Sequence, residues 1–306
     1  MSNFQLGLNT YFAVKRWPEP EVWLRMIKED FLVDITQFDL DLLDPRTTEP
    51  ARSIQAQKIK ENAEKFQVKI QGTFTGGVAY HQNLLLHPDY NMRIDALDWF
   101  NNAIIISKKI GAESLGAIYG ALSMSDFKND FKKNFLENEF KYAIHSIASS
   151  AKIAGLKYLL IEPSPVPREI PSSIEESIRL YEFLNEGSPL PIKFLFDLGH
   201  TCSYAAKGEE ADPYFWIKKI GKFCKVIHLQ QTNGKADCHW SFTKENNKNG
   251  IINADKVINT MLESGIEDVY LIFELVHAFE ALESNVFDEV KESVDYWKVA
   301  LQKFDL

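Results

Sequence analysis

Four short apolar runs in the second half of the chain each lead into one side chain of a type that binds metal ions. The stretches 157–162, 192–200, 224–228 and 269–274 carry Glu162, Asp197, His228 and Glu274. Continuous apolar runs of this length, rich in β-branched residues and closed by polar loops, predict strands buried on both faces of a parallel sheet. Helices must cover both faces of such a sheet, which restricts the chain to α/β folds.

Eight strand-then-helix repeats can be placed along the sequence, at a spacing of roughly 30 to 45 residues that is typical of a (β/α)8 barrel. A chain of 306 residues suits one such barrel, so residues 1–306 are expected to form a single TIM-barrel domain. An open, doubly wound sheet is the alternative, but no glycine-rich dinucleotide-binding sequence follows the first strand. The predicted strands are 5–12, 33–42, 69–75, 114–119, 157–161, 192–196, 224–228 and 269–273, and the predicted helices are 18–28, 49–66, 92–109, 134–154, 174–185, 214–222, 253–264 and 285–304.

The composition argues against several kinds of binding partner and cellular location. The formal net charge is -9 and no basic stripe is visible, which argues against nucleic acid. The three cysteines are irregularly spaced, which argues against a disulfide framework. No run approaches the about 20 apolar residues of a membrane span, and the N-terminal stretch does not resemble a signal peptide. We therefore expect a cytoplasmic protein that binds neither membrane nor nucleic acid.

The four strand-end residues form the strongest candidate site. Barrel enzymes place their chemistry at the carboxyl ends of the strands, and adjacent strand ends can reach one ion. Glu162, Asp197, His228 and Glu274 would supply three carboxylates and one imidazole, a set that suits Mn²⁺, Mg²⁺ or Co²⁺, with Zn²⁺ as a further option. One polar residue at a strand end would mean little, whereas four predict one divalent metal ion.

Other polar residues fall where a substrate could be held. Asn9 lies near the end of the first predicted strand, where it could line the floor of a pocket. His81 and His239 lie in the loops 78–89 and 230–249, and long loops in compact domains are often functional. Each of these residues could equally be an ordinary loop residue exposed to solvent.

Four short motifs carry a resemblance to a known family. The sequences IEP at 161–163, DLGH at 197–200, IHL at 227–229 and FEL at 273–275 resemble the sugar isomerase/epimerase superfamily with the xylose-isomerase-like barrel. The chain is similar to the ketose 3-epimerases and hydroxypyruvate isomerases of that group. The stretch 9–21 and HWSFT at 239–243 also resemble a subgroup that acts on tetrulose phosphates.

The resemblance implies roles for particular residues. The four strand-end residues would bind the metal, and Glu162 and Glu274 would also act as acid and base on opposite faces of the substrate. His200 would contact the substrate oxygens. In the family a substrate-binding arginine often follows the metal-binding histidine, but here Gly234 and Lys235 occupy that region. Lys235 could bind the substrate in its place, although lysine is not an equivalent donor. The family also implies a homodimer or homotetramer.

These observations predict an isomerase or epimerase of a small ketose or ketose phosphate that works through a metal-stabilised enediolate. The sequence does not choose between epimerisation and aldose–ketose isomerisation. One alternative is a metal-dependent phosphodiester hydrolase like endonuclease IV, which would need more metal ligands, for example His81, His239 and His277; the acidic charge balance argues against it. A barrel that only binds a sugar would not require four ligands.

Overall fold

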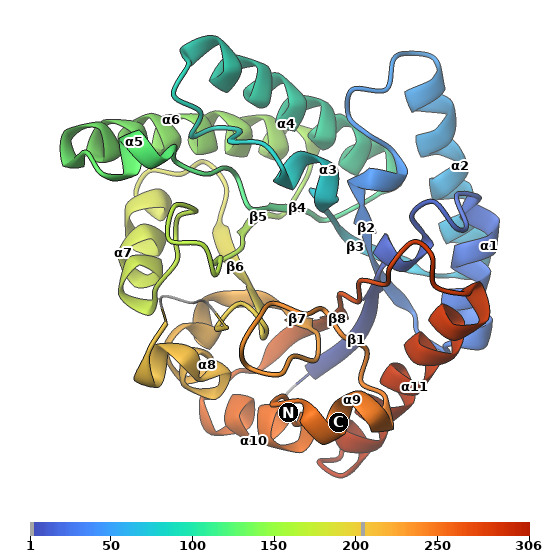
Figure 1. The fold of residues 1–306 in the computed structure, drawn as a ribbon. Helices are drawn as coiled ribbons and strands as arrows, with labels where there is room; N and C mark the ends of the chain where they lie inside the picture. The colour runs from blue at the N-terminus through green and yellow to red at the C-terminus, as the bar shows by residue number, and fades with distance from the viewer. Residues whose placement is uncertain (1–2, 203–205) are drawn as a thin grey trace. The chain divides into compact units, whose positions relative to one another are not determined.

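The structure, a computed structural model, describes residues 3–202 and 206–306. Its eight strands follow one another in chain order around a closed parallel barrel, which confirms the predicted fold class (Figure 1). The strands are β1 (Asn3–Asn9), β2 (Ile35–Asp39), β3 (Lys69–Phe74), β4 (Ser114–Ala117), β5 (Tyr158–Ile161), β6 (Ile192–Asp197), β7 (Cys224–Leu229) and β8 (Asp268–Phe273). The helices are α1 (Pro20–Arg25), α2 (Ala51–Phe66), α3 (Gly76–Tyr80), α4 (Tyr90–Ile110), α5 (Met124–Phe127), α6 (Asp130–Ala154), α7 (Ile174–Asn185), α8 (Pro213–Ile220), α9 (Lys244–Asn249), α10 (Ala254–Glu263) and α11 (Glu283–Gln302).

The chain divides into two compact units. The first comprises Met1–Gln37, Asn62–Lys69 and Leu195–Leu306, and the second comprises Phe38–Glu61 and Ile70–Phe194. That all residues from 1 to 306 form one domain stays a prediction from the sequence.

In the first unit, β1 is the central strand of a parallel group. It pairs with β8 along its length and with β2 at Asn9, which lies opposite Gln37. The strand β7 pairs with β8 on the other side, so that His228 lies opposite Ile272. The helices α10 and α11 pack against each other outside these strands (Figure 1), and Trp297 of α11 is completely buried. The parallel register brings the carboxyl ends of these strands to one edge.

In the second unit, β3, β4, β5 and the start of β6 pair in parallel, and α4 packs against α6. Capping residues determine where several helices of this unit begin and end. The Ser173 hydroxyl accepts a hydrogen bond from the Glu176 N–H and caps α7. Gly111 and Gly155 end α4 and α6 in the left-handed conformation that glycine adopts without strain.

Several predicted boundaries are wrong in detail. The second strand ends at Asp39, because the Asp39 side chain accepts a hydrogen bond from the Asp41 N–H and begins a 3-10 helix instead. The first predicted helix is only the six-residue α1, followed by a π-helical turn over Met26–Asp30. The loops 78–89 and 230–249 are also partly helical, since α3 reaches Tyr80 and α9 begins at Lys244.

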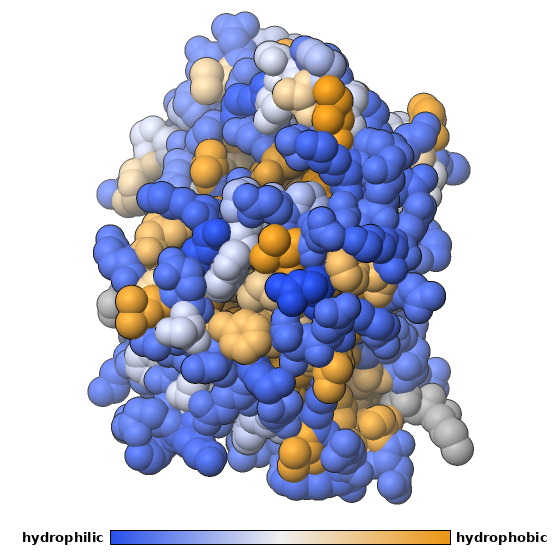
Figure 2. All heavy atoms as spheres, turned by 90° about the vertical axis from the view of Figure 1, so that its right-hand side faces the viewer, coloured by the Kyte–Doolittle hydropathy of each residue, from blue (hydrophilic) through white to orange (hydrophobic). Residues whose placement is uncertain are grey.

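The surface is mixed in character. On the face shown in Figure 2, apolar side chains are interspersed among hydrophilic ones. Among the helices that the structure describes, none has both the length and the apolar character needed to cross a membrane.

Candidate metal centre

Three of the four predicted metal ligands meet in the first unit. Asp197 ends β6, His228 lies in β7, and Glu274 follows β8. Their exposed fractions are 0%, 0% and 8%, so all three are shielded from bulk water. His228 Nδ1 is 3.0 Å from Glu274 Oε2 and 3.9 Å from Asp197 Oδ2. One ligand atom from each residue lies within 4.8 Å of the others, a spacing at which a single ion could contact all three.

Hydrogen bonds fix one end of the Asp197 carboxylate and leave the other end uncovered. Asp197 Oδ1 accepts hydrogen bonds from the Gly199 N–H at 2.6 Å and from Gln230 Nε2 at 2.8 Å. Asp197 Oδ2 is buried and has no hydrogen-bond partner among the residues that the structure describes. Burying a carboxylate oxygen without a partner is costly. The uncovered oxygen, beside an imidazole and a second carboxylate, fits the hard or borderline divalent cations that this donor set prefers.

The orientation of His228 is set from the opposite side of its ring. His228 Nε2 lies 2.7 Å from Gln37 Oε1, which also accepts a hydrogen bond from Asn9 Nδ2 at 3.0 Å. An amide oxygen only accepts hydrogen bonds, so Nε2 must carry a proton. Nδ1 is therefore the atom that the ring turns toward Asp197 and Glu274. Imidazole ligands of metals are oriented by partners of this kind.

Burial and neighbouring charges shift the pKa values in this cluster. Burial raises the pKa of Asp197 above its ordinary value. Burial also acts to raise the pKa of Glu274, but the charge and hydrogen bond of His228 outweigh it and hold this pKa at about 2. The cluster thus keeps a carboxylate in a buried place, where positive charge is needed to balance it.

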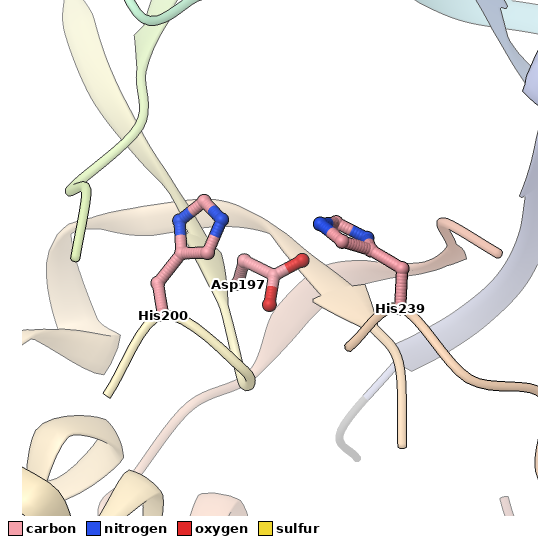
Figure 3. A group of neighbouring side chains, drawn as sticks. All are labelled: Asp197, His200 and His239. Carbon is pink, nitrogen blue, oxygen red and sulfur yellow. The ribbon is translucent and has the colours of Figure 1, made fainter. Parts of the chain in front are cut away.

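A second group of charged side chains adjoins these three residues. The group Asp197, His200 and His239 also offers ligand atoms within 4.8 Å of one another, and Figure 3 shows the two imidazoles on either side of the Asp197 carboxylate. Asp237 Oδ2 joins the histidines, at 3.4 Å from His200 Nε2 and 3.1 Å from His239 Nε2. His239 Nδ1 lies 3.2 Å from the Glu274 carbonyl oxygen.

The charges in this second group are opposite and paired. Burial acts to lower the pKa of His239, but the hydrogen bond and charge of Asp237, together with Glu274 and Asp197, raise this pKa to about 10. Burial acts to raise the pKa of Asp237, but the charges of His200 and His239 and their hydrogen bonds lower it well below its ordinary value. His239 is therefore a cation and Asp237 an anion at neutral pH.

The other predicted site residues lie in different surroundings. Asn9 is buried and its side chain bonds to Gln37, so it belongs to the support of His228. Lys235 is exposed, and its replacement of the family arginine as a substrate contact stays a prediction. Glu162 and His81 belong to the second unit. There Glu162 follows β5 and is buried, whereas His81 is exposed at the end of α3, and their roles stay predictions.

Three residues of the cluster were not predicted from the sequence: Gln37, Gln230 and Asp237. Gln37 lies near the end of β2, so the rule that identified the charged residues at strand ends could have found it. Gln230 follows His228 by two residues and could have been found in the same way. Asp237 lies in the loop after β7, and no periodicity predicts the path of such a loop.

Comparison with known proteins extends this description. No protein-family model matches the chain. The chain is 26% identical over 299 residues to D-erythrulose 1-phosphate 3-epimerase of Brucella abortus (strain 2308), and this match covers 95% of the chain and 94% of that protein.

Two solved structures are similar over nearly their full length. A protein of Rhodospirillum rubrum ATCC 11170, provisionally assigned as a xylose isomerase, has a TM-score of 0.91 and 28% identity, with 97% of this chain and 99% of that chain covered. D-psicose 3-epimerase from Clostridium cellulolyticum H10, solved with D-tagatose, has a TM-score of 0.70 and 13% identity, with 97% and 99% covered. At that lower identity the likeness concerns the fold alone.

The comparisons confirm the resemblance that the four strand-end motifs indicated. A named epimerase matches nearly the whole chain, and the solved structures share its closed barrel. The chain is thus similar, over nearly its whole length, to sugar isomerases and epimerases that have the xylose-isomerase-like barrel.

Proposed function

We propose that the chain is a divalent-metal-dependent 3-epimerase of a small ketose phosphate of the tetrulose class. The observation that carries this proposal is the buried cluster of Asp197, His228 and Glu274, in which Asp197 Oδ2 lacks a hydrogen-bond partner among the described residues. The similarity to a protein named D-erythrulose 1-phosphate 3-epimerase supports the phosphorylated four-carbon substrate and favours epimerisation over aldose–ketose isomerisation.

The reaction must remove a weakly acidic proton from the carbon next to a carbonyl group. A divalent cation held by Asp197, His228 and Glu274 would supply Lewis-acid polarisation of that carbonyl. The pKa of Glu274 lies below its ordinary value, so Glu274 is ionised at neutral pH, and its carboxylate is the group that would accept the proton. Return of a proton to the opposite face of the same carbon inverts the configuration there. From the sequence, Glu162 stays the predicted fourth ligand and the partner acid for this return.

The histidines would hold and orient the substrate. His200 borders the cluster at Asp197, where it could donate a hydrogen bond to a substrate oxygen (Figure 3). His239 carries a positive charge beside Glu274 and suits contact with a substrate oxygen that gains negative charge. Contacts of His81 and Lys235 with the substrate, a choice among Mn²⁺, Mg²⁺ and Co²⁺ over Zn²⁺, a homodimer or homotetramer and a cytoplasmic location are further parts of this proposal.

The test follows solvent deuterium into the substrate. We expect the Mn²⁺-loaded protein in D2O to place deuterium at carbon 3 of D-erythrulose 1-phosphate, faster than in unphosphorylated D-psicose or D-tagatose. Glu274→Gln should lower this exchange by about 10²- to 10⁴-fold, because an amide cannot accept the proton. Thermal denaturation serves as the control for folding. Exchange at the wild-type rate in Glu274→Gln would remove this residue from the chemistry.

Metal content separates the proposal from phosphodiester hydrolysis. The proposed reaction needs one divalent ion per chain, whereas a hydrolase like endonuclease IV needs several. About one ion by elemental analysis, together with deuterium exchange, supports the epimerase. About three zinc ions with cleavage of a nucleic acid would contradict it.

A further inference from the structure

Two adjacent glutamines follow β7, and their side chains serve different purposes. Gln230 and Gln231 are both completely buried. Gln231 Nε2 donates to Asn247 Oδ1 at 2.8 Å and to the Ile252 carbonyl oxygen at 2.9 Å, and its Oε1 accepts from the Ile252 N–H at 3.0 Å. Gln231 thus ties the end of β7 to α9 and to the segment that precedes α10. Its bonds are those of a structural residue.

Gln230 uses the same amide groups to form hydrogen bonds within the candidate site. Its Nε2 donates to Asp197 Oδ1 at 2.8 Å and to Asp237 Oδ1 at 2.6 Å, and its Oε1 accepts from the His239 N–H at 2.5 Å. An amide nitrogen has two protons, so both donors are used by carboxylates. Among uncharged side chains only the amides offer two N–H donors together with a carbonyl acceptor, and asparagine is one methylene shorter.

The backbone around Gln230 is shaped to receive this amide. A Cβ atom at Gly199 would lie 2.3 Å from Gln230 Cδ, so any larger residue there would displace the amide from this position. His239 has a φ of 48°, a left-handed conformation that is uncommon for residues other than glycine, although asparagine, aspartate and histidine adopt it more often than most. The hydrogen bond from the His239 N–H to Gln230 Oε1 helps to hold this conformation. The amide therefore fixes both the metal-side carboxylate and the loop that carries His239.

We propose that Gln230 is a positioning residue that couples the metal ligand Asp197 to the pair Asp237 and His239. By occupying Asp197 Oδ1 it leaves Oδ2 turned toward His228, and by holding Asp237 it orders the two histidines that this carboxylate joins. The part of this inference that concerns metal affinity rests on the proposed function. The part that concerns the histidines does not.

The test compares variants at the two glutamines in the full-length protein. Gln230→Met removes all three hydrogen bonds, and Gln230→Glu keeps the shape and the acceptor but loses both donated bonds. We expect both variants to bind Mn²⁺ about 10- to 100-fold more weakly than wild type by titration calorimetry. The matched control Gln231→Met should lower the melting temperature and leave the Mn²⁺ affinity unchanged. The NMR ring signals of His200 and His239 should shift in Gln230→Glu and stay in place in Gln231→Met.

The possible results distinguish a positioning role of Gln230 from a purely structural one. Wild-type Mn²⁺ affinity in the Gln230 variants, or equal weakening in Gln231→Met, would overturn the coupling. If Gln230→Met does not fold, Gln230→Glu carries the comparison because it preserves the volume of the side chain. If wild type binds no divalent ion, the proposed function fails, and the ring signals of His200 and His239 alone then test whether Gln230 positions them.

Discussion

His228 uses its two ring nitrogens for two separate tasks. Nε2 donates to Gln37 Oε1 at 2.7 Å, and Nδ1 lies 3.0 Å from Glu274 Oε2. Asn9 Nδ2 donates to the same Gln37 oxygen at 3.0 Å, which holds the glutamine amide in the orientation that His228 needs. The ring is therefore oriented by neutral amides, and the charged residues remain on the side where a cation would bind.

Gln37→Leu should weaken the binding of Mn²⁺. Leucine has a similar volume but cannot accept the proton on His228 Nε2, so the ring loses the partner that orients it. We expect about a 10- to 100-fold rise in the Kd for Mn²⁺, measured by titration calorimetry. A near-wild-type circular dichroism spectrum is the control for folding. An unchanged Kd would show that the strand geometry alone orients His228.

At the scale of elements, α11 supports the end of β8 that carries Glu274. Trp297 of α11 packs edge-on against Phe273, the last residue of β8, with ring centroids 6.4 Å apart, and against Phe242 at 5.4 Å. The Phe242 N–H also donates to Ser293 Oγ of α11 at 2.8 Å. One helix face therefore anchors both the strand before Glu274 and the loop that contains His239.

Trp297→Ala should destabilise the protein strongly. The side chain is completely buried, so its removal leaves a large cavity, and the expected loss in the free energy of unfolding is about 3–5 kcal/mol. The matched control is Val299→Ala on the same helix, because Val299 is 55% exposed and should change this free energy by less than about 0.5 kcal/mol. Equilibrium unfolding in urea measures both. Equal losses in the two variants would contradict the anchoring role.

The metal ligands at the strand ends could be predicted from the sequence, whereas the residues that orient them were not predicted. Asp197, His228 and Glu274 could be predicted because parallel pairing brings strand ends to one edge and apolar runs mark where strands end. Gln37 and Gln230 also lie at strand ends, but they were missed because only charged and metal-binding residue types were considered there. Lys235 is exposed, and its role, which was predicted from the family's arginine, stays a prediction. Loop conformation depends on tertiary contacts that no local rule supplies.

The whole molecule carries a net negative charge, and negative side chains are also concentrated at the candidate site. The net charge is -9, and the first unit places the carboxylates of Asp197, Glu274 and Asp237 around two histidines. Like charges held together in a folded state oppose folding unless positive charge is added. A bound divalent ion should therefore stabilise the whole protein.

Chelation should lower the melting temperature. A ligand that binds only the folded state at one hundred times its Kd adds about 2.7 kcal/mol to the free energy of unfolding. We expect Mn²⁺ to raise the melting temperature of EDTA-treated protein in a concentration-dependent way, as measured by scanning calorimetry. In Asp197→Asn the rise should be much smaller, because the ion loses an anionic ligand. A Mn²⁺ effect of wild-type size in that variant would argue against a site at Asp197.

The close approach of Gly199 to Gln230 also bears on how this enzyme could be re-engineered. Any side chain added at position 199 would enter the space that the amide fills, so saturation libraries should leave this glycine unvaried. Lys235 lies in the loop after β7 and is open to solvent, so replacements there should leave the packing around Gln230 intact while testing its proposed contact with the substrate. Attempts to broaden the range of sugars accepted would therefore begin at the rim of the β7 loop and spare the turn after β6.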